Sequence, residues 1–148
     1  MTTTARLDTT ARLELMDLYA RYSRAFDDGD AESVARLFTE DGSFTREGAP
    51  PVRGRAALVE MARAAATRAP GNRHIVSGAL VEPSDGGATG TAYVLVLNVR
   101  ADAVSLVAMG RYHDQFVLED GSWRIRSRHF VPFTGPGLAG TVLATVAS

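Results

Sequence analysis

Residues 88–99 read ATGTAYVLVLNV and residues 104–118 read VSLVAMGRYHDQFVL, and these two segments decide the fold. In both, β-branched and aromatic residues recur with a period of two, which predicts strands rather than helices. The polar loop that joins them is short, so we expect antiparallel neighbours. Residues 74–82 and 123–131 repeat the pattern, separated from these strands by short turns rich in Asp and Gly. The second half of the chain therefore predicts an antiparallel meander.

The first half of the chain begins with helical periodicity. Apolar residues spaced three and four positions apart predict an amphipathic helix, and they are Ala11, Leu15, Leu18, Tyr22, Ala25 and Phe26. Asp8 or one of the two threonines after it is suited to cap the start of this helix, and Gly29 is suited to end it.

A second, shorter helix is expected directly afterwards. Asp30 is suited to cap it, and Leu37 and Phe38 are expected at its apolar face. Residues 40–42, Glu-Asp-Gly, predict the turn that ends this helix, and residues 43–46 predict a brief strand.

The order of these elements predicts an α+β fold. A third helix is expected from about Arg55 to Thr67, ended by Pro70. Helices followed by a meander indicate three helices packed on one face of a curved, mainly antiparallel sheet. No linker or repeat divides the chain, so residues 1–148 are expected to form a single domain. The last segment, residues 132–148, is interpreted as a disordered tail, an added strand or a cover over a pocket.

Composition excludes several classes of function. Sixteen basic and seventeen acidic residues give no broad positive surface, so no nucleic-acid partner is expected. The chain has no cysteine, and its three histidines lack the spacing of metal ligands, so no metal site is expected. The N-terminus does not have the pattern of a signal peptide, and no stretch approaches the roughly eighteen apolar residues of a membrane helix. These features predict a cytoplasmic protein without a membrane partner.

Six short patterns occur along the chain in a characteristic order: Tyr22…Asp27-x-x-Asp30, Leu37-Phe38-Thr39-Glu40-Asp41-Gly42, Arg53-Gly54-Arg55, Arg73-His74-x-Val76, Gly110-Arg111-Tyr112-x-Asp114 and Asp120-Gly121-x-Trp123-Arg124-Ile125. Their order and spacing resemble the SnoaL-like group of the nuclear-transport-factor-two-like superfamily, over about residues 8–131. The resemblance implies a cone-shaped α+β barrel. The group includes scytalone dehydratase, bile-acid dehydratase and polyketide cyclases, so the resemblance also implies acid/base chemistry without a cofactor.

The resemblance further implies a pair of catalytic side chains. In the dehydratases of the group, an aspartate at the end of the first helix orients a histidine at the start of the strand after the third helix. Asp27 and His74 resemble these two residues. A neutral imidazole held by a carboxylate can remove a proton next to a carbonyl near neutral pH, so His74 is the expected general base. The residues alone leave two alternatives: Asp27 could bind turn amides near Gly29, and His74 could be a core histidine.

Other candidates concern the binding of an enolate oxygen. The dehydratases have a histidine or an aspartate where this chain has Asn98, which cannot transfer a proton but can donate a hydrogen bond. Tyr22 is expected to share this role, although on an ideal helix it points about 140° away from Asp27. The two residues face one cavity only if the helix unwinds near Asp27. Tyr112 resembles a substrate-binding asparagine of the scytalone enzyme, and its hydroxyl is expected to bind substrate.

The remaining substrate-binding candidates are expected to line a cavity or the core: Phe44, Met61, Val96, Met109 and His129. His129 alternates with Ile125 and Val131, so it is expected on their face of the sheet, with packing as the alternative role. Arg124, Arg126 and Arg128 share the opposite face of that strand, where surface ion pairs or an oligomer contact are expected.

Two functions from different classes follow from these residues. The first is a cofactor-independent dehydratase, isomerase or cyclase that acts on an apolar, carbonyl-bearing small molecule such as a polyketide or a steroid-like compound. The alternative is a non-catalytic module that binds a small molecule or assists assembly. By analogy with related proteins, the outer face of the sheet is expected to form a homodimer, with a trimer as the alternative.

Overall fold

A computed structural model describes residues 7–133 and 142–144. Along the chain, the elements are α1 (Thr9–Asp27), α2 (Ala31–Arg36), β1 (Phe38–Arg46), β2 (Val52–Arg53), α3 (Arg55–Arg68), β3 (Asn72–Ser84), β4 (Gly87–Val99), β5 (Ala103–Glu119), β6 (Ser122–Pro132) and β7 (Val142–Ala144). None of the helices in the described part of the chain is long and apolar enough to cross a membrane.

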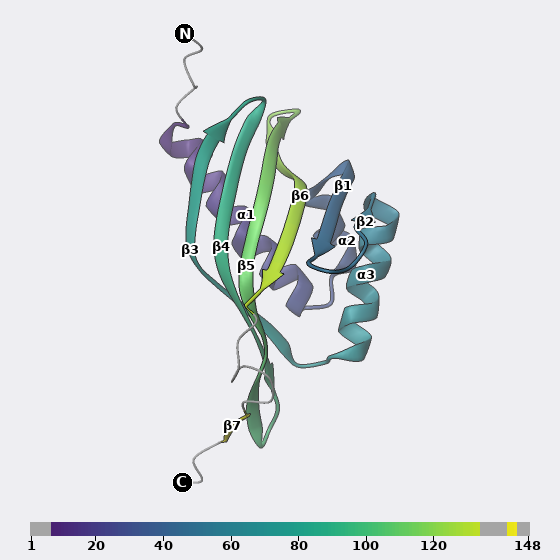
Figure 1. Ribbon diagram of the computed structural model, residues 1–148. Helices are drawn as coiled ribbons and strands as arrows, with labels where there is room; N and C mark the ends of the chain where they lie inside the picture. Colours follow the sequence, from purple (N-terminus) through teal and green to yellow (C-terminus); the bar gives the residue numbers. More distant parts are fainter. Residues whose placement is uncertain (1–6, 134–141, 145–148) are drawn as a thin grey trace.

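The strands form one curved sheet with the order β2-β1-β6-β5-β4-β3, and β7 pairs with the start of β5. All neighbouring pairs are antiparallel except β1 and β6, which are parallel. In Figure 1, α1 runs across the back of the long strands, and α2 and α3 lie beside β1 and β2. We call the sheet face toward α1 the inner face. The predicted α+β fold, with three helices packed on a curved and mainly antiparallel sheet, is confirmed, and the sheet is not closed.

The predicted helix ends are confirmed by the capping contacts. The Asp8 carboxylate accepts a hydrogen bond from the Ala11 N–H at 2.8 Å, and the Asp30 carboxylate accepts one from the Ser33 N–H at 3.1 Å. Between α1 and α2, Gly29 has a φ of 73°, which an L side chain rarely adopts. The chain can therefore turn sharply between these two helices.

The prediction for residues 37–42 is wrong. Phe38 begins β1 instead of extending α2, because the Leu37 carbonyl already accepts a sheet hydrogen bond from the Ile125 N–H at 2.9 Å. Residues 40–42 do not form a turn between elements but belong to an irregularity inside β1, where the pairing with β6 shifts register. Gly42 is required there, because an added Cβ would lie 2.8 Å from the Cβ of Phe38.

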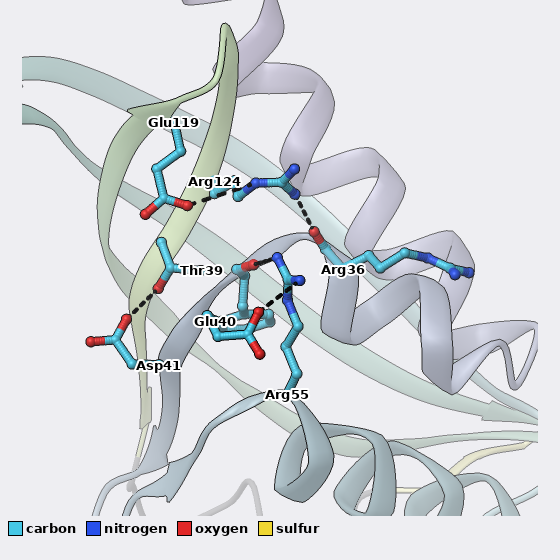
Figure 2. Close-up of polar contacts among 8 residues, drawn as sticks. Arg36, Thr39, Glu40, Asp41, Arg55, Glu119 and Arg124 are labelled. Atoms are coloured by element: carbon cyan, nitrogen blue, oxygen red, sulfur yellow. Dashed lines mark hydrogen bonds and ion pairs between the residues drawn. The ribbon is translucent and has the colours of Figure 1, made fainter.

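Two arginine side chains hold the junction between α2 and β1, as Figure 2 shows. Arg124 donates to the carbonyl of Arg36, the last residue of α2, at 2.6 Å. Arg55 donates to the Phe38 carbonyl and to the Glu40 carboxylate, both at 3.1 Å. These bonds satisfy carbonyl groups that the end of a helix and an irregular strand leave without regular partners.

The prediction that Arg128 lies at the surface is also wrong. The β5–β6 register shifts between two pairs, Gln115 with Ser127 and Phe116 with Ile125, so β6 carries one extra residue. Such a bulge reverses the alternation of faces beyond it. Ile125 and Arg128 are consequently both buried on the inner face.

The bulge also changes the position of His129. It pairs with the exposed His113 on the outer face, and its ring lies 2.6 Å from the Glu47 carboxylate. The expectation that His129 shares a face with Ile125 and lines a cavity is therefore wrong.

A fully buried ion pair lies at the centre of the inner face. Arg128 donates from Nε and Nη2 to the two carboxylate oxygens of Asp114, at 2.8 and 2.9 Å, and neither side chain is exposed. Three tyrosine rings enclose the guanidinium, whose carbon lies 4.2 Å from the ring centre of Tyr112, 4.3 Å from that of Tyr22 and 5.1 Å from that of Tyr19. Ion pairing and cation–π contacts thus offset the cost of burying this charge.

Residues 132–148 are described only in part. β6 extends to Pro132, and Val142–Ala144 form the short strand β7, which agrees with the interpretation of an added strand. Residues 134–141 and 145–148 lie outside the described chain, so a cover over a pocket stays a prediction.

We predict that Arg128→Met lowers the free energy of unfolding by about 3–5 kcal/mol, because it leaves the Asp114 carboxylate buried without its counter-charge. Urea denaturation of the two proteins measures this difference. Arg126→Met is the matched control, since Arg126 is exposed on the same strand and its loss should cost less than about 0.5 kcal/mol. Equal losses in the two variants would contradict the central role of the ion pair.

Candidate active site

Asp27 and His74 form the candidate site. Asp27 is the last residue of α1, and His74 is the third residue of β3, the edge strand of the sheet. The His74 ring nitrogen Nδ1 lies 2.6 Å from Asp27 Oδ1, and the His74 backbone N–H donates to Asp27 Oδ2 at 2.9 Å. Each side chain is 11% exposed. The carboxylate therefore holds both the backbone and the ring of one histidine.

This geometry fixes the tautomer of a neutral His74 ring. An ionised carboxylate only accepts hydrogen bonds, so Nδ1 carries the proton and Nε2 has a free lone pair. Within residues 7–133, the hydrogen bonds of the His74 side chain involve Nδ1 alone. The ring of Phe26 meets the imidazole edge to face, with 5.1 Å between ring centres, and restricts its orientation. The imidazole can thus accept a proton at Nε2.

The side-chain amide of Asn98 is bonded to other groups of the protein and has a structural role. Its Nδ2 donates to the Pro70 carbonyl at 3.0 Å and to Asn72 Oδ1 at 2.8 Å. Arg100 Nε donates to Asn98 Oδ1 at 2.9 Å. Both amide hydrogens are therefore used within the protein. Asn98 fastens the start of β3, two residues before His74, and in this conformation it has no hydrogen to donate to a substrate.

Tyr22 lies in the core beneath the site. α1 stays helical through Asp27, so the unwinding that would bring Tyr22 and Asp27 to one cavity does not occur. The Tyr22 ring packs between Phe26 and the guanidinium of Arg128, and the residue is 2% exposed. Burial raises the pKa of Tyr22 to about 12, although the nearby Arg128 charge lowers it. Its hydroxyl consequently stays protonated near neutral pH.

Tyr112 is the buried tyrosine whose ionisation is sensitive to Asp27. It lies on the inner face of β5, and its ring centre is 6.0 Å from that of Tyr22. Burial is the main reason that the pKa of Tyr112 lies well above its ordinary value, and the negative charge of Asp27 raises it further. The residue is 3% exposed, and its hydroxyl stays protonated near neutral pH.

The other candidates divide between the two faces of the sheet. Val96 pairs with His74 across β3 and β4, and Phe44 and Met61 pack against the core. Met109 pairs with Leu95 on the outer face, because its neighbour Gly110 pairs with the buried Val94 on the inner face. The expectation that Met109 lines an inner cavity is therefore wrong.

Two surface grooves reach the Asp27–His74 pair. The first has a volume of about 430 Å³ and runs past Asp27, between the ends of α1 and α3 and residues 69–73. The second has a volume of about 400 Å³ and follows the seam between α1 and β3, with His74 among its lining residues. The pair is therefore largely buried but lies close to solvent on both sides. Nothing in the described chain gathers three His, Cys, Asp or Glu side chains in a way that could hold a metal ion.

The ion pair of Asp114 and Arg128 was not predicted from the sequence. One signal was available, because Asp114 follows Tyr112 by two positions and so lies on the same, inner face of the strand. A carboxylate among buried residues requires a cation or several donors. The partner of Asp114 could not be identified from the sequence, because no residue pattern in β6 indicates the bulge that turns Arg128 to the inner face.

The family model of the SnoaL-like domain matches residues 8–129. The chain belongs to the SnoaL-like family. The family includes polyketide cyclases and dehydratases, which is consistent with an enzymatic role. No curated protein matches this member of the family.

Three solved structures of bacterial proteins are similar to this SnoaL-like chain. Rv3472 from Mycobacterium tuberculosis, a protein of unknown function, is 33% identical to this chain, with a TM-score of 0.80. The match covers 86% of this chain and 74% of the Rv3472 chain. ActVI-ORFA from Streptomyces coelicolor is 30% identical with a TM-score of 0.76, covering 84% and 98%. A protein from Catenulispora acidiphila in complex with S-DNPA is 28% identical with a TM-score of 0.77, covering 84% and 95%.

We predict that neutral His74 carries its proton on Nδ1 and that Asp27→Asn removes this preference, because a neutral amide can present either an acceptor or a donor to the ring. Long-range ¹⁵N–¹H correlation spectra of the imidazole distinguish the two tautomers. The exposed His113 is the internal control, and its tautomer should not respond to the substitution. A wild-type His74 protonated on Nε2 would contradict the geometry.

Proposed function

We propose that this SnoaL-like protein is a cofactor-independent acid/base enzyme, a dehydratase, isomerase or cyclase, that acts on an apolar, carbonyl-bearing small molecule such as a polyketide or a steroid-like compound. The observation that carries the proposal is the Asp27–His74 pair, with 2.6 Å between the carboxylate and Nδ1. This contact leaves Nε2 as the basic atom.

In the proposed reaction, His74 Nε2 removes a proton from the carbon next to the substrate carbonyl. The Asp27 carboxylate stabilises the imidazolium that forms, and the bond from the His74 backbone N–H keeps the carboxylate in place. The imidazolium then returns its proton to a leaving hydroxyl or to another carbon atom. A positioned base of this kind contributes about 10²–10⁴ to the rate.

We assign the binding of the developing enolate oxygen to Tyr112 rather than to Asn98. The Asn98 amide hydrogens are already bound to Pro70 and Asn72. Tyr112 lies on the inner face and is 3% exposed, its hydroxyl is neutral, and its ring contacts the guanidinium of Arg128. A neutral tyrosine hydroxyl can donate a hydrogen bond to an oxyanion.

The test uses S-DNPA, the compound bound by the related Catenulispora protein, together with a panel of bicyclic aromatic ketones. In deuterated buffer, the wild-type protein should accelerate hydrogen–deuterium exchange at the carbon next to the carbonyl, or convert the compound. His74→Gln should lose about 10²–10⁴ of that rate, because it removes the base. Mass spectrometry of the compound measures both reactions.

The control for this experiment is His113→Gln, which removes an exposed histidine on β5 and should keep the wild-type rate. Melting temperatures of the variants separate loss of chemistry from loss of fold. A rate that is unchanged in His74→Gln would refute the role of the base.

A non-catalytic binding module is the second candidate, and the structure of Asn98 favours it. The amide expected to bind the enolate oxygen is occupied within the protein, and Tyr22 lies in the core instead of beside the base. In this case the panel should contain compounds that bind to the wild-type protein without exchange or conversion.

We propose that the protein forms a homodimer through the outer face of the sheet. Ile75, Tyr93 and Val107 are 50, 42 and 53% exposed, and Leu95 and Met109 pair beside Tyr93 on this face. An exposed apolar row of this kind, with Ile75, Leu95 and Met109 side by side, is typical of an interface between protein subunits, and the guanidinium of Arg111 stacks on the Tyr93 ring beside it. A trimer is the alternative assembly.

We predict that light scattering on the wild-type protein gives twice the chain mass of 15.8 kDa and that Tyr93→Glu gives the monomer, because a buried, unpaired carboxylate destabilises an apolar interface. Leu13→Glu is the matched control, since Leu13 is 64% exposed but lies on α1. A dimer that persists in Tyr93→Glu would exclude this face.

A further inference from the structure

Three arginine side chains line one surface groove between α1 and α2. Arg21 and Arg24 of α1 and Arg36 of α2 lie around this groove, which has a volume of about 370 Å³. Asp30 is the carboxylate among its lining residues. Three positive charges therefore meet one negative charge, although the whole chain has a net charge of −1. The volume lies in the range of small-molecule sites, about 300–1,000 Å³.

Two of these arginines, Arg24 and Arg36, differ in their partners from the arginines that form ion pairs. Arg63 lies 3.0 and 2.9 Å from two carboxylates, Arg55 lies 3.1 Å from Glu40, and Arg128 is bound to Asp114. Within the described chain, Arg24 and Arg36 have no carboxylate within 4.0 Å.

The remaining contacts of the groove arginines are weak. Arg36 contacts the Ser33 hydroxyl at 3.5 Å. Arg21 lies 3.9 Å from Asp17, with both side chains more than two-thirds exposed. The guanidinium groups of the groove thus keep most of their hydrogen-bonding capacity.

Local structure explains only part of this arrangement. Arg24 and Arg36 are in the last turns of their helices, where the helix dipole favours a positive charge. The helix dipole does not explain the position of Arg21, which lies before the last turn of α1. It also does not explain why arginines of two helices line the same groove. In Figure 2 the Arg36 side chain extends away from Arg124, which binds the Arg36 carbonyl instead. Three like charges at one groove repel one another, and a bound anion would relieve this repulsion.

The carboxylate of the groove already has a structural role. Asp30 accepts a hydrogen bond from the Ser33 N–H and caps α2. No ion pair within 4.0 Å joins it to an arginine of the described chain. The net positive charge of the groove is therefore available to a ligand.

We propose that the α1–α2 groove binds the phosphate group of a small phosphorylated molecule. The planar fork of arginine matches the oxygen atoms of a phosphate, to which it can donate two parallel hydrogen bonds. A phosphate monoester carries a charge of about −1.5 to −2 at pH 7, which balances the net charge of the groove. Ala25 and Leu37 also line the groove and offer an apolar contact to the carbon part of the ligand.

The test is a titration of the full chain with phenyl phosphate, followed by calorimetry and by NMR shifts of the guanidinium groups. We expect saturable binding that Arg24→Gln and Arg36→Gln each weaken by about tenfold or more, because each removes charged hydrogen bonds. Arg68→Gln is the matched control, since Arg68 is exposed, lies on α3 outside the groove and removes the same charge. It should change the affinity by less than about twofold, as expected for distant surface charges screened by salt.

Benzoate is the matched ligand control, because it keeps the ring but carries a single charge, and it should bind about tenfold more weakly than phenyl phosphate. Arg36→Lys keeps the charge without the fork and should give an intermediate affinity. Arg24 also lines the groove that contains His74, so Asp27→Asn tests whether the two sites are independent, and this variant should bind phenyl phosphate as the wild-type protein does. Absence of saturable binding, equal affinity for benzoate, or an equal effect of Arg68→Gln would overturn the proposal.

Discussion

The buried pair of Asp114 and Arg128 is the interaction on which the rest of the structure depends. It joins β5 to β6 beyond the bulge, and its guanidinium is packed against Tyr19 and Tyr22 of α1. The ion pair therefore fixes where α1 crosses the sheet. Since α1 ends in Asp27, the same contact determines where the carboxylate meets β3. A charged centre in the core thus positions a polar site at its edge.

The sequence was sufficient for the elements that have a strong period and clear ends. The meander, α1 and α3 follow from alternation, from helical spacing and from caps such as Asp8. The irregularities in β1 and β6 were not predictable, because an extra residue in a strand changes neither composition nor local propensity. The bulge in β6 nevertheless reverses the faces of the residues beyond it, which is why Arg128 lies inside and His129 lies outside.

At the candidate site, too, the sequence predicted some side-chain contacts and not others. The order of the family patterns indicated that Asp27 and His74 belong together, and the structure places them in contact. The sequence could not indicate that the Asn98 amide hydrogens are already bonded within the protein. Their acceptors are a carbonyl and a side-chain amide that lie 28 and 26 positions away in the sequence. Residue type shows what a group can do, whereas its availability depends on contacts that only the fold creates.

The bond between Asp27 and the His74 backbone N–H has an evolutionary consequence. It ties the last turn of α1 to the edge strand of the sheet whatever side chain stands at position 74, so selection for folding acts on the aspartate independently of selection for chemistry. A relative that replaced the histidine would keep this tie, whereas a relative that replaced the aspartate would lose it. Among relatives of this protein, an aspartate retained without its histidine would therefore indicate selection for folding alone.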